Sequence, residues 1–245
     1  MKRRAAQEAR SRNEKIPKLY EIDYLLGVYD ESRMGALRFK TDRKGPFLDN
    51  DTKNPTPPWS SLGDLQEAVN HIESDSETNT IRQWLAVLIA PGSSLGGARP
   101  KANVLGKNGD LWIAKFPSKT DTIDKGAWEF LTYRLALDCG IEMAESKIEK
   151  ITGPYHTFLT KRFDCEDGQR IHFSSAMTMT GNTEESLKNV NPSYLDIVDV
   201  IENYGINVEE NLHQLWRRLI FNIAVSNTDD HLRNHGFIMN EKGWE

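Results

Sequence analysis

Residues 110–118 read DLWIAKFPS, and this short run contributes more to the fold assignment than any other part of the chain. The turn dipeptide Asn108-Gly109 precedes it and Pro117 follows the apolar run, which predicts a β-strand paired in a hairpin with the residues before the turn. The strand contains one charged side chain, Lys115. Burying an ammonium costs several kcal/mol unless an anion meets it. We therefore expect an anionic partner for Lys115; the alternative is an edge strand with Lys115 in water.

A glycine-rich stretch precedes this hairpin, and a helix is expected after it. Residues 92–101 read GSSLGGARPK, in which glycines permit close approach to a phosphate and N–H groups can form an anion-binding nest. The stretch is neither a Walker A loop nor a G-x-G-x-x-G loop, so a plain tight turn is the alternative. The predicted helix at about 124–139 places Glu129 where it can pair with Lys115, as a helix glutamate pairs with the strand lysine in kinases.

A polar loop, SNTDDHLRNHGF at residues 226–237, follows a strongly apolar predicted helix. Asp229 and Asn234 have the spacing of the aspartate and asparagine in the kinase loop H-R-D-x-x-x-x-N. In that loop the carboxylate accepts the substrate hydroxyl proton and the amide binds magnesium. The competing candidates are Asp230, His231 and His235. A zinc site of Asp and His residues is a further alternative, although the i, i+4 spacing of H-E-x-x-H is missing.

The rest of the chain predicts a mixture of helices and strands. Helices are expected at about 61–75, 77–92, 191–205 and 207–229, and strands at about 145–151 and 156–164. The last helix carries apolar residues that we expect to form a buried stripe: Leu212, Leu215, Trp216, Leu219 and Ile223. Glycine loop, strand lysine, helix glutamate, strand and aspartate–asparagine loop follow one another in the linear order of a protein-kinase site. The order favours a two-lobed α+β fold.

Composition excludes several other classes of protein. The 245 residues carry a net charge of −5, whereas a surface built to hold duplex nucleic acid needs a basic excess. Cys139 and Cys165 form no disulfide or zinc pattern, and no stretch of about 18 apolar residues predicts a membrane helix. We therefore expect a cytoplasmic protein that makes no membrane contact and reaches DNA only through a partner.

Several blocks of the sequence closely resemble the HipA family of bacterial toxin serine/threonine kinases. These blocks are YLLGVYDESRMGALRF, SLGGARPKA, LWIAKFPS, GAWEFLTYRLA, TKRFD, IHFSSAMTM and NTDDHLRNHGF. The resemblance implies a protein-kinase-like two-lobed α+β fold. Its expected parts are a partial N-terminal subdomain with a polar arm at 1–45, an ATP-binding N-lobe at 46–162, and the start of a helical C-lobe at 163–245.

The resemblance also implies a function. It predicts transfer of the ATP γ-phosphate, with Mg²⁺, to a serine of a translation-related protein such as an aminoacyl-tRNA synthetase. A HipB-like helix-turn-helix antitoxin would be the partner and would supply the contact with DNA. A different class of function stays open: a catalytically dead binding module that engages an antitoxin or a kinase partner.

Site residues can be carried over from the family position by position. Asp229 would be the catalytic base, Asn234 a magnesium ligand, Glu129 the ion-pair partner of Lys115, and Ser94 an autophosphorylation site that blocks the nucleotide pocket. The implied ATP-binding residues are Gly96, Gly97, Ala98, Arg99, Lys101, Lys115, Lys161, Phe163 and His231. Lys115 would bind the phosphates, while Lys161 and Phe163 would lie at the hinge near adenine.

Two features depart from the family pattern. Lys161 stands where some relatives carry an acidic residue, which leaves adenine recognition to backbone groups. The family also needs a second metal-binding aspartate beyond the strand after Asn234, and the printed residues up to Glu245 contain none there. We therefore expect these residues alone to be inactive, and the stripe around Trp216 and Ile223 to be partly uncovered.

Overall fold

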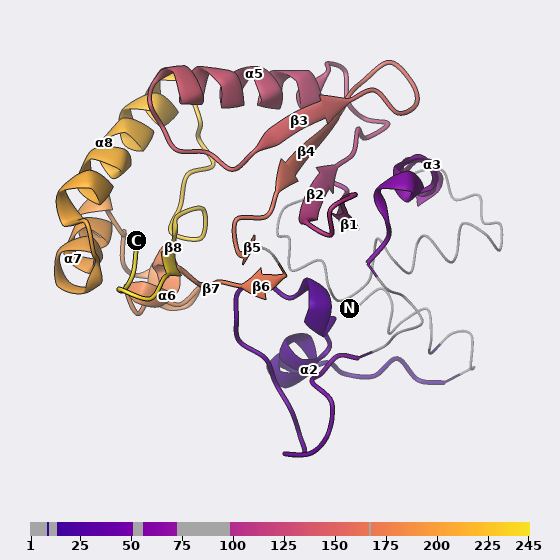
Figure 1. Ribbon diagram of the computed structural model, residues 1–245, viewed down its shortest axis with the longest axis horizontal. Coiled ribbons are helices and arrows are strands. Elements are labelled where there is room, and N and C mark those ends of the chain that lie inside the picture. The colour runs from indigo at the N-terminus through magenta and orange to yellow at the C-terminus, as the bar shows by residue number, and fades with distance from the viewer. Residues whose placement is uncertain (1–8, 10–13, 51–55, 73–98, 167) are drawn as a thin grey trace. The chain divides into compact units, whose positions relative to one another are not determined.

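The computed structural model describes residues 9, 14–50, 56–72, 99–166 and 168–245 (Figure 1). The chain divides into two compact units: unit 1 is Met1–Phe130 with Ala144–Arg162, and unit 2 is Leu131–Met143 with Phe163–Glu245. One division falls between Arg162 and Phe163, the boundary expected between the two lobes. That the three predicted segments are separate domains stays a prediction. Each unit is described by itself below.

Unit 1 contains a sheet with helices before and after its first hairpin. Its elements are α2 (Glu21–Leu26), two 3-10 turns (Asp30–Ser32 and Trp59–Ser61), α3 (Leu62–Ile72), β1 (Lys101–Leu105), β2 (Leu111–Lys115), the first part of α5 (Lys125–Asp138), β3 (Ser146–Glu149) and β4 (Thr157–Lys161). The helix predicted at 77–92 lies outside the described residues. No helix in the described ranges has both the length and the apolar character needed to cross a membrane.

The sheet of unit 1 is antiparallel throughout, in the order β1-β2-β4-β3. The predicted hairpin is confirmed, and Gly109 in its turn adopts φ +84°, a conformation that glycine reaches without steric strain. Successive side chains of a strand point to opposite faces. Trp112 and Ala114 of β2 are buried in the core, so Lys115 lies on the other face of the sheet.

Helix α3 covers the core face of this sheet. The apolar side chains Leu62, Leu65, Ala68 and Val69 on one side of α3 are buried, as in an amphipathic helix. Leu62, Leu65 and Val69 pack with Ala102, Val104, Trp112, Ala114, Phe116 and Leu159. One polar pair is buried with them, because the Thr157 hydroxyl donates to Gln66 Oε1 at 2.9 Å and Gln66 Nε2 donates to the Thr152 carbonyl at 2.7 Å. This pair fixes α3 against β4.

The N-terminal segment is joined to the sheet by a buried arginine. Arg162 follows β4 and donates to the carbonyl oxygens of Ser32 and Arg33 at 2.6 and 3.1 Å. Arg33 in turn donates to the carbonyls of Leu25 and Val28 at 2.9 Å each. Residues 25–33 therefore belong to unit 1 through hydrogen bonds to charged donors, which are among the stronger ones in proteins.

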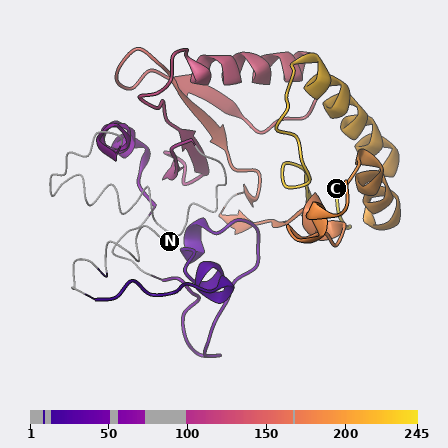
Figure 2. The same ribbon diagram turned by 180° about the vertical axis from the view of Figure 1, so that it is seen from behind.

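Unit 2 is mainly helical. Its elements are the rest of α5, β5 (Cys165–Glu166), β6 (Gln169–Arg170), β7 (His172–Ser175), α6 (Ala176–Met179), a 3-10 turn (Ser186–Lys188), α7 (Tyr194–Tyr204), α8 (Val208–Ala224) and β8 (Gly236–Met239). Figures 1 and 2 both show α7 and α8 side by side, and β7 pairs with β8. The core consists of Ala176, Ile197, Val200, Ile201, Leu215, Leu232 and Phe237. The two helices predicted at about 191–205 and 207–229 are thus confirmed as α7 and α8.

The stripe of α8 is buried only in part, and it is uncovered around Trp216 and Ile223, as expected from the sequence. Leu215 is buried and Leu212 packs against the core, but Trp216 is 62% and Ile223 68% exposed. The apolar residues of α8 form two neighbouring stripes, and only the stripe through Leu212 and Leu215 packs with α7. In α5, Trp128, Leu131 and Leu135 are exposed and Ala136 is buried. Helical spacing predicts a helix without showing which apolar stripe is covered.

Two glycines at the second position of a helix provide a matched test of this packing. A Cβ on Gly126 in α5 would lie 2.2 Å from the His156 carbonyl oxygen, whereas a Cβ on Gly63 in α3 would meet nothing within 4 Å. We predict that Gly126→Ala lowers the free energy of unfolding by about 1–3 kcal/mol because of overpacking. Gly63→Ala should leave it unchanged or raise it, by up to about 1 kcal/mol. Urea denaturation measures both, and equal effects would contradict the close approach.

Candidate active site

Lys115 and Glu129 form an ion pair in unit 1. The ammonium of Lys115, at the end of β2, donates to Glu129 Oε1 from α5. The Lys115 Nζ also lies 5.2 Å from the centre of the Phe158 ring. Because β2 has β1 on one side and β4 on the other, Lys115 does not stand on an edge strand, and that alternative is wrong. The helix glutamate thus meets the strand lysine in the pairing expected from the sequence.

A second lysine shares this face of the sheet. Lys101 of β1 lies directly opposite Lys115 in the antiparallel register, and directly opposite side chains in such a pair lie about 5 Å apart at Cβ. Burial and the neighbouring Lys115 charge hold the pKa of Lys101 below its ordinary value. Two ammonium groups beside one carboxylate leave an excess of positive charge. Binding of a further anion at this place would therefore be favourable.

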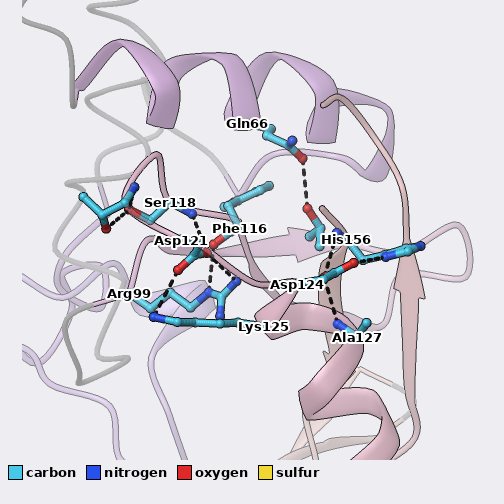
Figure 3. Close-up of polar contacts among 11 residues, drawn as sticks. Gln66, Arg99, Phe116, Ser118, Asp121, Asp124, Lys125, Ala127 and His156 are labelled. Atoms are coloured by element: carbon cyan, nitrogen blue, oxygen red, sulfur yellow. Dashed lines mark hydrogen bonds and ion pairs between the residues drawn. The ribbon is translucent and has the colours of Figure 1, made fainter. Parts of the chain in front are cut away.

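The loop from β2 to α5 is held by an arginine and a buried carboxylate (Figure 3). Arg99 Nε donates to the Phe116 carbonyl at 2.9 Å, and Arg99 Nη2 lies 3.3 Å from Asp121 Oδ2. Asp121 also accepts from the Ser118 N–H at 2.9 Å and pairs with Lys125 at 3.1 Å. The Arg99 guanidinium therefore holds this loop in place; its predicted contact with ATP stays a prediction.

A second carboxylate fixes the start of α5 beside β4 (Figure 3). Asp124 Oδ1 accepts from the N–H groups of Ala127 and His156 at 3.0 and 3.1 Å, and Asp124 Oδ2 lies 2.5 Å from His156 Nδ1. Asp124 is thus the N-cap of α5 and sets the position of Glu129 one turn further on. An aspartate at the start of a predicted helix is a cap signal, whereas His156 is the residue before β4, 32 positions further along the chain.

The two predicted hinge residues lie in different units. Lys161 faces the same way as its register partner Trp112, on the side of the sheet opposite Lys115, and its Nζ pairs with Asp110 at 3.1 Å. The Lys161 N–H donates to the Glu145 carbonyl at 2.8 Å. Phe163 in unit 2 is half-exposed with its ring 5.5 Å from that of Phe173. Roles for Lys161 and Phe163 near adenine stay predictions.

The loop between α8 and β8 presents the predicted catalytic residues in unit 2. Asp229 is 90% exposed, and its Oδ1 lies 3.7 Å from His231 Nε2. The Asn234 side-chain N–H donates to the Asp229 carbonyl, and the Asn234 backbone N–H donates to the His231 carbonyl at 2.8 Å. These bonds bring the carboxylate of Asp229 and the amide of Asn234 onto one tight turn.

Asp230 has a different environment from its neighbour Asp229. It is nearly buried and accepts from Tyr194 Oη, from Asn222 Nδ2 at 2.9 Å and from His235 Nε2 at 2.8 Å. Burial, together with the Asp230 carboxylate, raises the pKa of Tyr194 to about 12. Although burial opposes it, the donors and the His235 charge hold the pKa of Asp230 below its ordinary value. Asp230 is therefore an acceptor already used by three donors.

Asp230 and His235 were expected as alternative candidates to Asp229 in this loop, whereas Tyr194 and Asn222 were not predicted to take part in the site. A polar residue such as Asn222 inside an apolar helix is a usable signal. Tyr194 has no local signal, since only folding brings it to the loop. Within the described ranges, no three His, Cys, Asp or Glu side chains gather in a way that could hold a metal ion.

Mg²⁺ prefers oxygen ligands, and the residues on the turn fit this preference. Asn234 uses its amide nitrogen in the bond to Asp229, and its amide oxygen and the exposed Asp229 carboxylate are both of the required kind.

Four predicted residues of the glycine-rich stretch lie outside the described residues: Ser94, Gly96, Gly97 and Ala98.

Comparisons with known proteins define first the fold and then the family. HipA of Shewanella oneidensis MR-1, solved with HipB and its operator DNA, matches with a TM-score of 0.60 and 18% identity over 98% of this chain and 59% of HipA. The Helicobacter pylori proinflammatory kinase CtkA gives a TM-score of 0.45 at 16% identity, covering 59% of this chain and 51% of CtkA. No curated protein matches. The match to HipA confirms the predicted α+β fold class of HipA type.

The family model of the HipA-like C-terminal domain matches residues 93–245. This chain therefore belongs to that family, as the sequence blocks indicated. It spans about three fifths of the solved HipA chain, since 59% of HipA is covered.

Asp121 gives a test by pH of the Arg99 loop. Burial alone would raise its pKa, but the Ser118 N–H, Lys125 and Arg99 outweigh burial and hold the pKa below the ordinary 3.8. A carboxyl with a depressed pKa in the folded state stabilises the fold above its unfolded pKa, and this stability is lost as pH falls through the folded pKa. We predict that Asp121→Asn lowers the free energy of unfolding at pH 7 by about 1–3 kcal/mol.

The difference from the parent should shrink below about pH 4, where the parent carboxyl also becomes protonated. Urea denaturation at a series of pH values measures this, with Asp138→Asn on the exposed end of α5 as the control. If the difference in free energy of unfolding between the parent and Asp121→Asn did not change with pH, the Asp121 charge would not stabilise the loop.

Proposed function

We propose that this chain is the kinase region of a HipA-type protein that transfers the γ-phosphate of ATP to a serine hydroxyl of a protein. The observation that carries the proposal is the charged cluster of unit 1, in which Lys115 is held by Glu129 and faces Lys101 across the strand pair. Kinases use a strand lysine of this kind on the ATP phosphates, with a helix glutamate as its partner.

The polar turn of unit 2 supports the second half of the reaction. A general base must be able to reach the hydroxyl whose proton it accepts, and the exposed carboxylate of Asp229 is open to a substrate. Asp229 would accept the serine proton as the hydroxyl oxygen forms a bond to the γ-phosphorus and the bond from that phosphorus to the ADP oxygen breaks. Asn234 would hold Mg²⁺, which neutralises phosphate charge when bound.

The same reasoning extends to partners. A HipB-like antitoxin is proposed as the binding partner because the HipA structure that this chain resembles was solved with HipB and operator DNA. The net charge of −5 supports DNA contact through such a partner. For the substrate we propose a translation-related protein such as an aminoacyl-tRNA synthetase, and for autophosphorylation Ser94, as the family resemblance implies.

Nucleotide binding is tested by removing the phosphate lysine. We predict that Lys115→Ala weakens ATP affinity by roughly tenfold to a hundredfold, because a charge-assisted hydrogen bond contributes about 1.5–3 kcal/mol. Isothermal titration calorimetry with ATP and Mg²⁺ measures the dissociation constant. Lys107→Ala, at the exposed turn of the same hairpin, is the matched control. Equal affinity of Lys115→Ala and Lys107→Ala would contradict the phosphate contact.

Phosphoryl transfer is tested at the proposed base. In the HipA-type protein that contains this kinase region, Asp229→Asn should lower the rate of serine phosphorylation by about a hundredfold or more, since general base catalysis contributes about 10²–10⁴. ATP affinity should stay near that of the parent because the proposed phosphate contacts come from unit 1. Mass spectrometry of phosphoserine on an added synthetase, beside calorimetry, separates the two effects. Parent-like phosphorylation by Asp229→Asn would refute the assignment.

The assay also decides between the two classes of function. If the parent binds ATP and forms phosphoserine, it is an enzyme. A parent that forms none, yet binds a HipB-like protein, would be a binding module.

A further inference from the structure

Asp230 joins three elements of unit 2 at the base of the catalytic turn. Its carboxylate accepts from Tyr194 at the start of α7, from Asn222 in the last turns of α8, and from His235 just before β8. The rings of Tyr194 and His235 also contact each other edge-on, with centres 5.4 Å apart. Hydrogen bonds to an ionised acceptor are roughly twice as strong as neutral ones, so this carboxylate fixes the relative positions of the three elements.

Asn222 extends this network into the turn itself. Its carbonyl accepts from the Asn227 N–H at 2.8 Å, and its side-chain oxygen accepts from Asn227 Nδ2 at 3.2 Å. The side-chain oxygen of Asn227 then accepts from the Asp229 N–H at 3.2 Å. A chain of hydrogen bonds therefore runs from the Asp230 carboxylate through Asn222 and Asn227 to the backbone of Asp229.

The other end of the turn is tied down by the backbone. The His235 carbonyl accepts from the Ala176 N–H at 2.9 Å, and the Leu232 carbonyl accepts from the Met177 N–H at 3.1 Å. Leu232 is buried in the core of unit 2. Between these fixed points, the side chain of Asp229 is exposed. The turn thus combines an anchored frame with an open carboxylate.

We propose that Asp230, held by Tyr194, Asn222 and His235, is the positioning residue that sets the geometry of Asp229 and Asn234 for phosphoryl transfer. The proposal rests on the proposed kinase function. The two neighbouring aspartates then have separate roles. The exposed carboxylate of Asp229 is accessible to the substrate, whereas the carboxylate of Asp230 accepts three hydrogen bonds that hold the turn in place. A misplacement of about 1 Å can lower the rate of a reaction by about a hundredfold.

The test uses variants that remove one donor at a time, because Asp230→Ala would leave several buried donors without an acceptor and risks unfolding the unit. Tyr194→Phe removes the hydroxyl, and its matched control is Tyr204→Phe on the exposed end of the same helix. His235→Ala removes the second donor. His235→Gln keeps an N–H that can reach Asp230 and serves as the conservative rescue.

Two readouts are measured on the HipA-type protein that contains this kinase region. The first is kcat and KM for ATP in the phosphoserine assay, and the second is amide hydrogen exchange of the peptide covering residues 226–235. We expect Tyr194→Phe and His235→Ala to lower kcat by about tenfold to a hundredfold, with KM for ATP nearly unchanged. Exchange in 226–235 should rise, while α3 and β2 exchange as in the parent. Both values should return toward the parent in His235→Gln and be unaffected in Tyr204→Phe.

The outcomes separate this proposal from the proposed function. Unchanged exchange at 226–235 in both Tyr194→Phe and His235→Ala would overturn the anchor, whether or not the parent is active. Faster exchange with an unchanged kcat would overturn its role in positioning. If the parent forms no phosphoserine, the proposed kinase function fails, and faster exchange in the variants still supports the anchor.

Discussion

Because β2 pairs with β1 on one side and with β4 on the other, its side chains have only two directions available. The burial of Trp112 and Ala114 against α3 settles which direction is the core. Lys115 must then face away from that core, toward Glu129 of α5. The position of the charged cluster follows from the packing of an apolar strand, and the capping of α5 by Asp124 brings the carboxylate to it.

Local patterns in the sequence were sufficient for the fold class, the hairpin, and the pairing of Lys115 with Glu129. Each depends on residues close in the chain or on an order of elements that few folds share. The side of a helix that is covered could not be predicted from helical spacing, which places Trp216 and Ile223 in one stripe with the buried Leu215. Their spacing is compatible with burial, yet burial depends on what other segments of the protein pack against that side.

Contacts between residues that lie far apart along the chain could not be predicted from the sequence either. His156, just before β4, contacts the start of α5, and Tyr194 of α7 contacts Asp230. No motif connects the members of either pair. The neighbouring residues Asp229 and Asp230 could not be told apart fully from the sequence either. Spacing alone favours Asp229, and only the structure shows that the Asp230 carboxylate accepts hydrogen bonds from Asn222 and His235. The sequence shows that two carboxylates stand side by side in this loop, but it does not show which one is exposed and which one holds the turn in place.

The strand order β1-β2-β4-β3 has a consequence for how unit 1 can fold. It consists of two hairpins, each made from strands that follow one another in the chain, and local contacts of this kind form fastest. Joining β2 to β4 closes a much longer loop that contains α5 and β3, so the entropy of loop closure falls mainly on that one step. Gln66 and Thr157, 91 residues apart, can meet only after it. The Gln66–Thr157 contact is therefore expected to form late, whereas Lys115 and Glu129 are 14 residues apart and can pair before the two hairpins dock.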